Sequence, residues 1–188
     1  GTTGNGILPD LTPSTHTTLD ALQLQNALHD YAKQGATFAS LEASSHGLEQ
    51  GRLNGCAIEI AVYSNLSRDH LDYHGTLEAY AEAKALLFRF SSLKVAVINL
   101  DDEHAALMIN AAKQNPAQPK ILTYSLTQNT ADYYITDLSY SLAGATFNLV
   151  SPQGSFAVQS PLLGHFNVEN LVAALIAAEQ AGFDLKAL

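Results

Sequence analysis

Cysteine is nearly absent from the 188-residue sequence, which holds Cys56 alone. A single cysteine forms no disulfide within the chain, and it cannot build a zinc site that needs several cysteines. This excludes proteins that are stabilised by internal disulfides and proteins that fold around a multi-cysteine zinc site. The scarcity suits a reducing compartment, and we expect the protein in the cytoplasm.

Long apolar runs are missing as well. The longest, at 171–178, is far shorter than the about 20 residues that a helix needs to cross a bilayer. No basic stretch followed by an apolar stretch opens the chain, so no secretory signal peptide is predicted. We therefore expect no membrane partner.

Positive charge is scarce too. Nine Lys and Arg residues stand against 18 Asp and Glu residues, which gives a formal net charge of -9. The sequence has no cluster of Lys and Arg for a phosphate backbone, so we expect no nucleic-acid partner. An anionic substrate would need metal ions or a few well-placed cations to offset repulsion from this chain.

The phosphate-binding pattern G-x-x-x-x-G-K-[ST] is also absent, and the opening residues 1–6 (GTTGNG) contain no lysine. An ATP-dependent activity would need such a loop from outside these residues. Glycine and proline predict an irregular loop over residues 1–13, and the sequence stops just after a predicted helix. We interpret the chain as an excised piece of a longer protein.

The residues that are present have the composition of a folded domain. Hydrophobic residues make up 47% and charged residues 14%, which favours one domain with a substantial core. Helical and strand-like patterns alternate along the chain. The predicted helices cover 18–33, 76–90 and a long stretch from Asn167 to near Gly182, and the predicted strands cover 36–41, 57–63, 95–99 and 121–124. Asp101 is expected to cap the helix that follows the third strand.

The pattern changes over residues 133–159. Stretches rich in β-forming residues alternate there with turns at Gly144 and 152–154, which predicts an antiparallel meander. Alternating strands and helices elsewhere favour a parallel sheet covered on both faces. The predicted class is therefore α/β, with a mainly parallel sheet flanked by helices and a small antiparallel β extension.

Lys84 is the residue most at odds with its surroundings. On a helix over 76–90, Glu78, Glu82 and Arg89 form one polar stripe, and Lys84 lies away from it on the apolar side. A lysine that points inward is costly unless it is paired or chemically modified. It can equally extend its amine to a nearby edge, and the spacing leaves both interpretations open.

A first polar cluster, at 65–75, follows the predicted strand 57–63. It contains two histidines, His70 and His74, together with two aspartates and an arginine. Loops at the C-terminal ends of parallel strands build active sites, and these side chains can supply metal ligands and an acid or base. A solvated loop with turn-forming residues is the other interpretation.

A second polar cluster, at 42–52, follows the predicted strand 36–41. Glu42 is suited to bind a hard cation. Ser44, Gln50 and Arg52 are hydrogen-bond donors for carboxylates or phosphates. When segment 42–52 is considered alone, a polar turn is the simpler interpretation.

Two further segments open predicted helices. Thr17 and Thr18 can cap the first helix or bind an anion at its N-terminus. Asn167 can cap the last helix. Asn167 and Asn170, one turn apart, can instead bind an amide-like group such as adenine. Capping is the commoner role in both places.

Taken together, these segments resemble the Mur ligase family, and within it the branch that forms the tripeptide of a cell-wall precursor. The resemblance rests on five segments in the family's order: HTTLDALQLQ, LEASSHGLEQGR, SNLSRDHLDYHGTLEAYAEAKALLF, VINLDD and LLGHFNVENLVAAL. It covers most of the chain and is weak over 133–159. It implies that residues 1–188 are the family's central, ATP-binding domain, which resembles P-loop ATPases. The opening strand with its phosphate loop, the N-terminal UDP-binding domain and the C-terminal amino-acid-binding domain would all be absent.

The resemblance also implies a reaction. ATP phosphorylates the terminal carboxylate of UDP-N-acetylmuramoyl-L-alanyl-D-glutamate, and the amine of a diamino acid then attacks the acyl phosphate. These residues do not distinguish meso-diaminopimelate from lysine as that diamino acid.

The resemblance implies roles for the singled-out residues as well. Lys84, in a carbamylated form, and His70 are implied to be catalytic. Together with Glu42, they are also implied to hold Mg²⁺. The implied contacts to the muramoyl-peptide are Thr17, Thr18, Ser44, Gln50 and Arg52, and the implied adenine contacts are Asn167 and Asn170.

Two alternatives stay open. Another Mur ligase or a folylpolyglutamate synthetase would share the expected fold and the modified lysine, although the pattern SSHGL-x-Q-x-R favours the tripeptide-forming branch. The chain would otherwise be a non-catalytic binding module. Because no phosphate loop is present, we expect the 188-residue chain to be inactive by itself.

Overall fold

The computed structural model describes residues 1–67 and 71–187, and of Leu71 it describes the backbone only. The chain divides into two compact units. The first unit comprises Gly1–Ala57 and His70–Leu87, and the second comprises Ile58–Asp69 and Phe88–Leu188. The two units therefore alternate along the sequence, and each is described separately.

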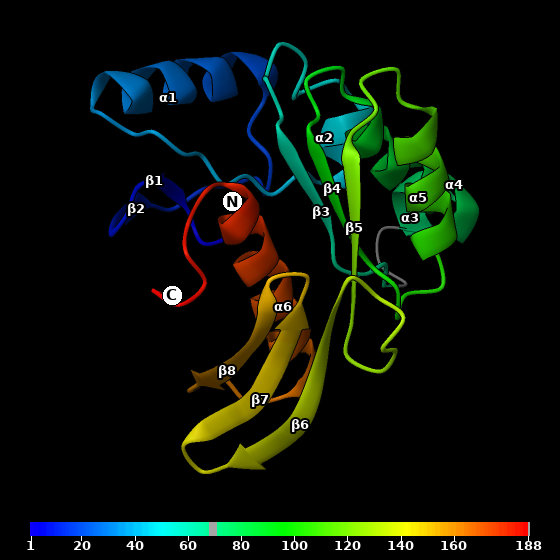
Figure 1. Ribbon diagram of the computed structural model, residues 1–188. Helices are drawn as coiled ribbons and strands as arrows, with labels where there is room; N and C mark the ends of the chain where they lie inside the picture. The colour runs from blue at the N-terminus through cyan, green and yellow to red at the C-terminus, as the bar shows by residue number, and fades with distance from the viewer. Residues whose placement is uncertain (68–70, 188) are drawn as a thin grey trace. The chain divides into compact units, whose positions relative to one another are not determined.

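The first unit is mainly helical (Figure 1). Its helices are α1 (Ala21–Lys33), α2 (Ser45–Glu49), α3 (Leu71–His74) and α4 (Leu77–Ala85), and its two short strands are β1 (Asn5–Ile7) and β2 (Asp10–Thr12), which pair antiparallel. Side chains fix where two helices begin. Asp20 accepts a hydrogen bond from the Gln23 N–H at 2.9 Å, and Thr76 accepts one from the Ala79 N–H at 3.1 Å. The helix predicted at 18–33 is present but begins only at Ala21, because Asp20 caps it and neither Thr17 nor Thr18 does. The helix predicted at 76–90 is confirmed and continues as a 3₁₀ turn over Leu86–Arg89.

Two expectations for the first unit are wrong. Residues 36–41 form no strand. Phe38 and Leu41, two of the larger apolar side chains of this run, are exposed. The opening residues, expected to be irregular, contain the β1–β2 pair, whose register joins Asn5 to Thr12.

The second unit is built on a six-stranded sheet of order β3-β4-β5-β6-β7-β8 (Figure 1). Its strands are β3 (Ile60–Tyr63), β4 (Val95–Asn99), β5 (Lys120–Ser125), β6 (Tyr133–Ser141), β7 (Gly144–Ser151) and β8 (Gly154–Ser160). Pairing is parallel from β3 to β6 and antiparallel from β6 to β8. The predicted α/β class, the parallel sheet and the antiparallel extension are therefore confirmed.

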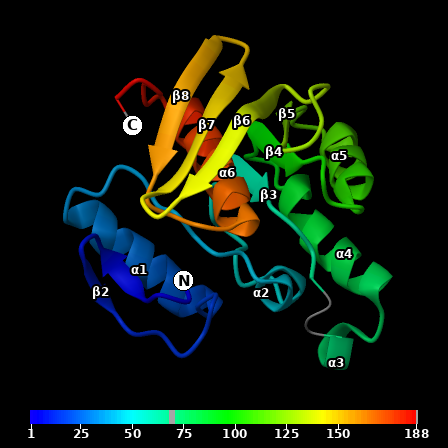
Figure 2. The same ribbon diagram turned by 90° about the horizontal axis from the view of Figure 1, so that it is seen from below.

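Two helices cover this sheet. The long helix α6 (His165–Gln180) and the helix α5 (Ala105–Gln114) lie on opposite faces of it (Figures 1 and 2). Val95 and Val97 of β4 pack in one buried cluster with Val172 of α6. All five residues of β4 are buried, as expected of a strand covered on both sides. Within the described part of the chain, no helix combines the length and apolar character needed to cross a bilayer.

Two predicted caps in the second unit are wrong. Asp101 does not cap α5, whose N-cap residue is His104. The Asp101 carboxylate instead accepts hydrogen bonds from Ser125 and Thr127, at 2.6 Å each. Asn167 lies inside the first turn of α6, and Gly164, with φ of 96°, is the N-cap residue. A glycine tolerates that backbone conformation, which asparagine would adopt less readily.

Candidate functional site

Thr18 connects the segments on either side of α1. Its side chain is buried, and its hydroxyl donates to the Glu42 carbonyl at 2.6 Å. The same hydroxyl accepts a hydrogen bond from the Ser44 N–H at 2.9 Å. Thr17, by contrast, is exposed. Thr18 thus has a structural role, while Thr17 presents its side chain to solvent.

Arg52 brings the predicted substrate contacts together. One Nη donates to the Thr18 carbonyl at 2.9 Å, while Nε and the other Nη donate to the Gln50 Oε1 at 2.9 and 2.6 Å. The Gln50 amide in turn donates to the Tyr73 hydroxyl at 3.2 Å. A guanidinium held on several sides presents its positive charge in a fixed orientation, which suits recognition of an anionic group.

Ser44 has a structural role as the N-cap of α2. Its hydroxyl accepts a hydrogen bond from the Gly47 N–H at 3.1 Å. Gly47 was not singled out in the sequence, yet a Cβ there would lie 2.9 Å from the Thr18 Cγ2 and 3.0 Å from the Ser44 Oγ. The absent side chain lets α2 approach Thr18 closely. Local sequence patterns gave this glycine no separate role, because the close approach involves Thr18 on the other side of α1.

Glu42 is exposed and lies beside the first residues of the chain. Its Oε2 accepts hydrogen bonds from the Thr2 N–H and from the Thr2 hydroxyl, the latter at 2.7 Å. The carboxylate is an oxygen ligand of the kind that Mg²⁺ prefers. Within residues 1–67 and 71–187, no three His, Cys, Asp or Glu side chains gather closely enough to hold a metal. His70 lies outside the described residues.

Lys84 is partly buried on α4. Its Nζ lies 5.1 Å from the centroid of the Tyr80 ring, one helical turn earlier. Glu78, Glu82 and Arg89 are exposed, in agreement with the predicted polar stripe. Lys84 therefore packs apart from that stripe, against an aromatic face.

In the second unit, the predicted adenine contacts lie near the start of α6. Asn167 and Asn170 are both exposed, and the Asn167 amide donates to the Leu163 carbonyl at 2.7 Å. Glu169, between them in sequence, is buried. Burial raises the pKa of the Glu169 carboxyl, an effect that His165 and a hydrogen bond with Asn99 only partly oppose.

Two aspartates after β4 hold neighbouring loops in this unit. Asp102 accepts from the Tyr63 hydroxyl at 2.7 Å and from the Leu66 N–H at 2.9 Å. Burial acts to raise the pKa of Asp101, but hydrogen bonds from Ser125, Thr127 and neighbouring groups outweigh it and lower the pKa. The segment VINLDD thus fastens the loops at the C-terminal edge of the sheet, where parallel α/β proteins place their ligands.

Comparison with known protein families shows to which family this chain belongs. The family model described as the Mur ligase middle domain matches residues 1–178. The chain belongs to the Mur ligase family. The resemblance drawn from the five sequence segments is confirmed.

Relatives with assigned names extend this result. The chain is 43% identical over 185 residues to a UDP-N-acetylmuramoyl-L-alanyl-D-glutamate–2,6-diaminopimelate ligase of Pseudomonas aeruginosa, covering 98% of this chain and 37% of the relative. It is 43% identical over 188 residues to the ligase of the same name from Vibrio cholerae, covering 100% of this chain and 37% of the relative. The chain therefore spans little more than a third of the length of these relatives.

Solved structures give the same picture. One, described as a UDP-N-acetylmuramoyl-L-alanyl-D-glutamate–2,6-diaminopimelate ligase, is 89% identical with a TM-score of 0.95, and the match covers 100% of this chain and 38% of that one. MurF from Acinetobacter baumannii is 28% identical with a TM-score of 0.58, and the match covers 68% of this chain and 27% of that one. An FPGS from L. casei is 17% identical with a TM-score of 0.55 over 84% of this chain and 43% of that one, a likeness of fold alone.

Proposed function

We propose that the whole protein is an ATP-dependent ligase that joins 2,6-diaminopimelate to UDP-N-acetylmuramoyl-L-alanyl-D-glutamate during synthesis of a peptidoglycan precursor in the cytoplasm. The observation that carries this proposal is the likeness, along the entire chain, to a solved ligase of that name at 89% identity. The name also favours diaminopimelate over lysine, a choice that the sequence left open.

The 188 residues are assigned to the central, ATP-binding part of this ligase. The match to the middle-domain model over residues 1–178 supports the assignment. The sequence has no G-x-x-x-x-G-K-[ST] pattern, so the phosphate loop for ATP is assigned to a part of the protein outside these residues. In this proposal, Asn167 and Asn170 at the start of α6 bind the adenine, and their exposure supports that role.

The muramoyl-peptide is assigned to the cluster around Arg52. Thr17, Thr18, Ser44, Gln50 and Arg52 contact it in this proposal, and all but Thr17 are joined by hydrogen bonds. The charge of Arg52 suits the anionic precursor, which the net charge of the chain would otherwise repel. Holding the substrate carboxylate in one orientation is the main contribution that such a cluster makes to phosphoryl transfer.

Lys84 is proposed to act as a carbamate. Its neutral amine attacks the carbon of CO₂, an N–C bond forms, one C=O bond becomes C–O⁻, and the amine proton leaves to solvent. The carbamate, Glu42 and His70 would then hold Mg²⁺, and these mostly oxygen donors fit that ion. When bound, Mg²⁺ neutralises charge on the transferred phosphoryl group.

Two competing functions make different predictions. Another Mur ligase would prefer a different incoming group, and a solved structure described as MurF resembles this chain at 28% identity. A non-catalytic binding module would bind the muramoyl-peptide and release no ADP.

The deciding experiment is an ADP-release assay of the whole protein with UDP-N-acetylmuramoyl-L-alanyl-D-glutamate. We expect turnover with meso-diaminopimelate and little with lysine or D-alanyl-D-alanine. Arg52→Lys keeps the charge but loses the guanidinium fork, and it should raise KM for the precursor by about tenfold, which corresponds to the loss of one charge-assisted hydrogen bond. Arg89→Lys, at an exposed position, is the matched control. Turnover with D-alanyl-D-alanine alone, or no turnover, would reject the assignment.

A further inference from the structure

The short helix α3 lies between the two predicted parts of the site in the first unit. Tyr73 and His74, on α3, contact α2, while His74 also contacts α4. α2 carries Ser44 at its N-cap and Gln50 at its end, and α4 carries Lys84. The contacts of His74 therefore join the substrate side to the lysine side.

The imidazole of His74 is fixed by α2. Its side chain is 1% exposed, and its Nε2 lies 2.9 Å from the hydroxyl of the buried Ser45. Its Nδ1 lies 3.7 Å from a carboxylate oxygen of Glu49. A polar ring is buried at low cost only when its nitrogen atoms have partners, so these two α2 residues set the ring orientation.

The same imidazole supports Tyr80. The two rings stack with an interplanar angle of 16° and a centroid distance of 5.1 Å, which is an offset stack. Tyr80 is buried, and it lies four residues before Lys84 on the same face of α4. The Lys84 Nζ lies 5.1 Å from the centre of the Tyr80 ring.

We propose that His74 is a positioning residue that, through Tyr80, holds Lys84 in the orientation in which it forms its carbamate. The inference rests on the proposed function, since it assumes that Lys84 is carbamylated. Because Ser45 directly follows the substrate contact Ser44, the contacts run from the muramoyl-peptide cluster to the lysine. Ordinary core packing would need only the shape of the ring, whereas positioning also needs its hydrogen bond to Ser45.

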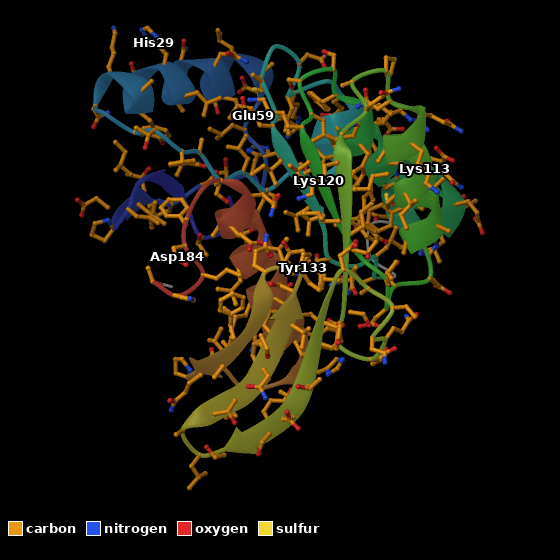
Figure 3. All side chains as sticks on the ribbon, viewed as in Figure 1. His29, Glu59, Lys113, Lys120, Tyr133 and Asp184 are labelled. Atoms are coloured by element: carbon orange, nitrogen blue, oxygen red, sulfur yellow. The ribbon has the colours of Figure 1, made fainter. Side chains whose placement is uncertain are left out.

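His74→Phe separates these two roles in the whole protein, because it keeps an aromatic ring for Tyr80 and removes both nitrogens. With ¹³C-bicarbonate and no Mg²⁺, we expect the carbamate NMR signal, identified by its absence in Lys84→Ala, to fall several-fold. The turnover number should fall at least about tenfold, since a displacement of ~1 Å at a reacting group can cost ~100-fold. KM for the muramoyl-peptide should stay unchanged. His29→Phe, at an exposed position of α1 (Figure 3), is the matched control.

Ser45→Ala guards against a folding defect in His74→Phe. It removes only the hydroxyl that orients the imidazole, and it should give the same selective loss of carbamate and turnover number. Because the buried His74 Nε2 then lacks its partner, the melting temperature should fall by a few degrees, with the unfolding transition still cooperative. Normal carbamate and turnover in both variants would overturn the inference and leave the ligase function standing. A wild-type protein with neither carbamate nor ligase activity would reject the proposed function itself.

Discussion

At the scale of single residues, Gly47 lies where α2 approaches Thr18 closely. An added Cβ would lie 2.9 Å from the Thr18 Cγ2, closer than real side chains come. We expect Gly47→Ala to destabilise the fold by about 1–3 kcal/mol, the usual cost of overpacking. It should also raise KM for the muramoyl-peptide, because Thr18 holds both the Arg52 fork and the Ser44 N–H. Urea unfolding and steady-state kinetics measure the two effects.

The control for this change is Ala32→Ser, which also adds one heavy atom but at an exposed position of α1. It should leave KM unchanged and alter stability by less than ~1 kcal/mol. If Gly47→Ala matched the control in both measurements, α2 would not be held tightly against Thr18.

The sequence best predicted those site residues that break the pattern of their neighbours. Lys84 was singled out because a charged side chain broke an apolar pattern, and it is indeed partly buried against Tyr80. Gly47 was assigned no role, and His74 was considered only as a metal ligand or an acid or base. Their packing roles come from contacts with residues 29 positions away, Ser45 for His74 and Thr18 for Gly47. Such contacts leave no periodic trace in a sequence.

At the scale of secondary structure, packing of α6 on the sheet buries an ionisable group. Glu169 lies on α6 with its carboxyl buried, and burial raises its pKa above the ordinary value. The folded state then holds the proton more tightly than the unfolded state does. The stabilising contribution is therefore full at pH below the unfolded pKa and is lost as the pH rises through the folded pKa.

Glu169→Gln should remove this part of the pH dependence. We expect the variant to melt a few degrees higher than wild type at neutral pH and at nearly the same temperature at pH 4, where the wild-type carboxyl is protonated. Thermal melts across that range test the expectation. Glu103→Gln, at an exposed position, should leave the pH profile unchanged. A profile that is the same for Glu169→Gln and wild type would show that the carboxyl does not titrate in this window.

Elements were predicted well where local patterns decide them. The strand 95–99 and the meander after residue 133 were correct, because a fully apolar run and turn residues mark them directly. The strand at 36–41 was wrong, because an apolar run becomes a strand only when another strand pairs with it. Likewise, Asp101 was expected to cap α5 but binds the loop after β5, a partner 24 or more residues away.

At the scale of the whole molecule, the family resemblance predicted more about residue roles than local sequence patterns could. The five matched segments identified the family, while spacing alone left the roles of Lys84 and the polar clusters open. The structure joins Thr18, Ser44, Gln50 and Arg52 by hydrogen bonds, although no single segment predicted that they would meet. The reason is physical: these residues come from both sides of α1, and only the tertiary fold brings them together.

The 188-residue chain is expected to show no ATP hydrolysis by itself, whereas the whole protein should hydrolyse ATP when the muramoyl-peptide and diaminopimelate are present. Backbone N–H groups of a phosphate loop and its lysine bind the β- and γ-phosphates in P-loop enzymes, and the sequence contains no such pattern. An ADP-release assay of both proteins under identical Mg²⁺ and bicarbonate concentrations makes the comparison. Mg²⁺-dependent turnover by the 188 residues would show that another group binds the phosphates. The negatively charged chain would then have to supply that group from its nine Lys and Arg residues or from helix N-termini.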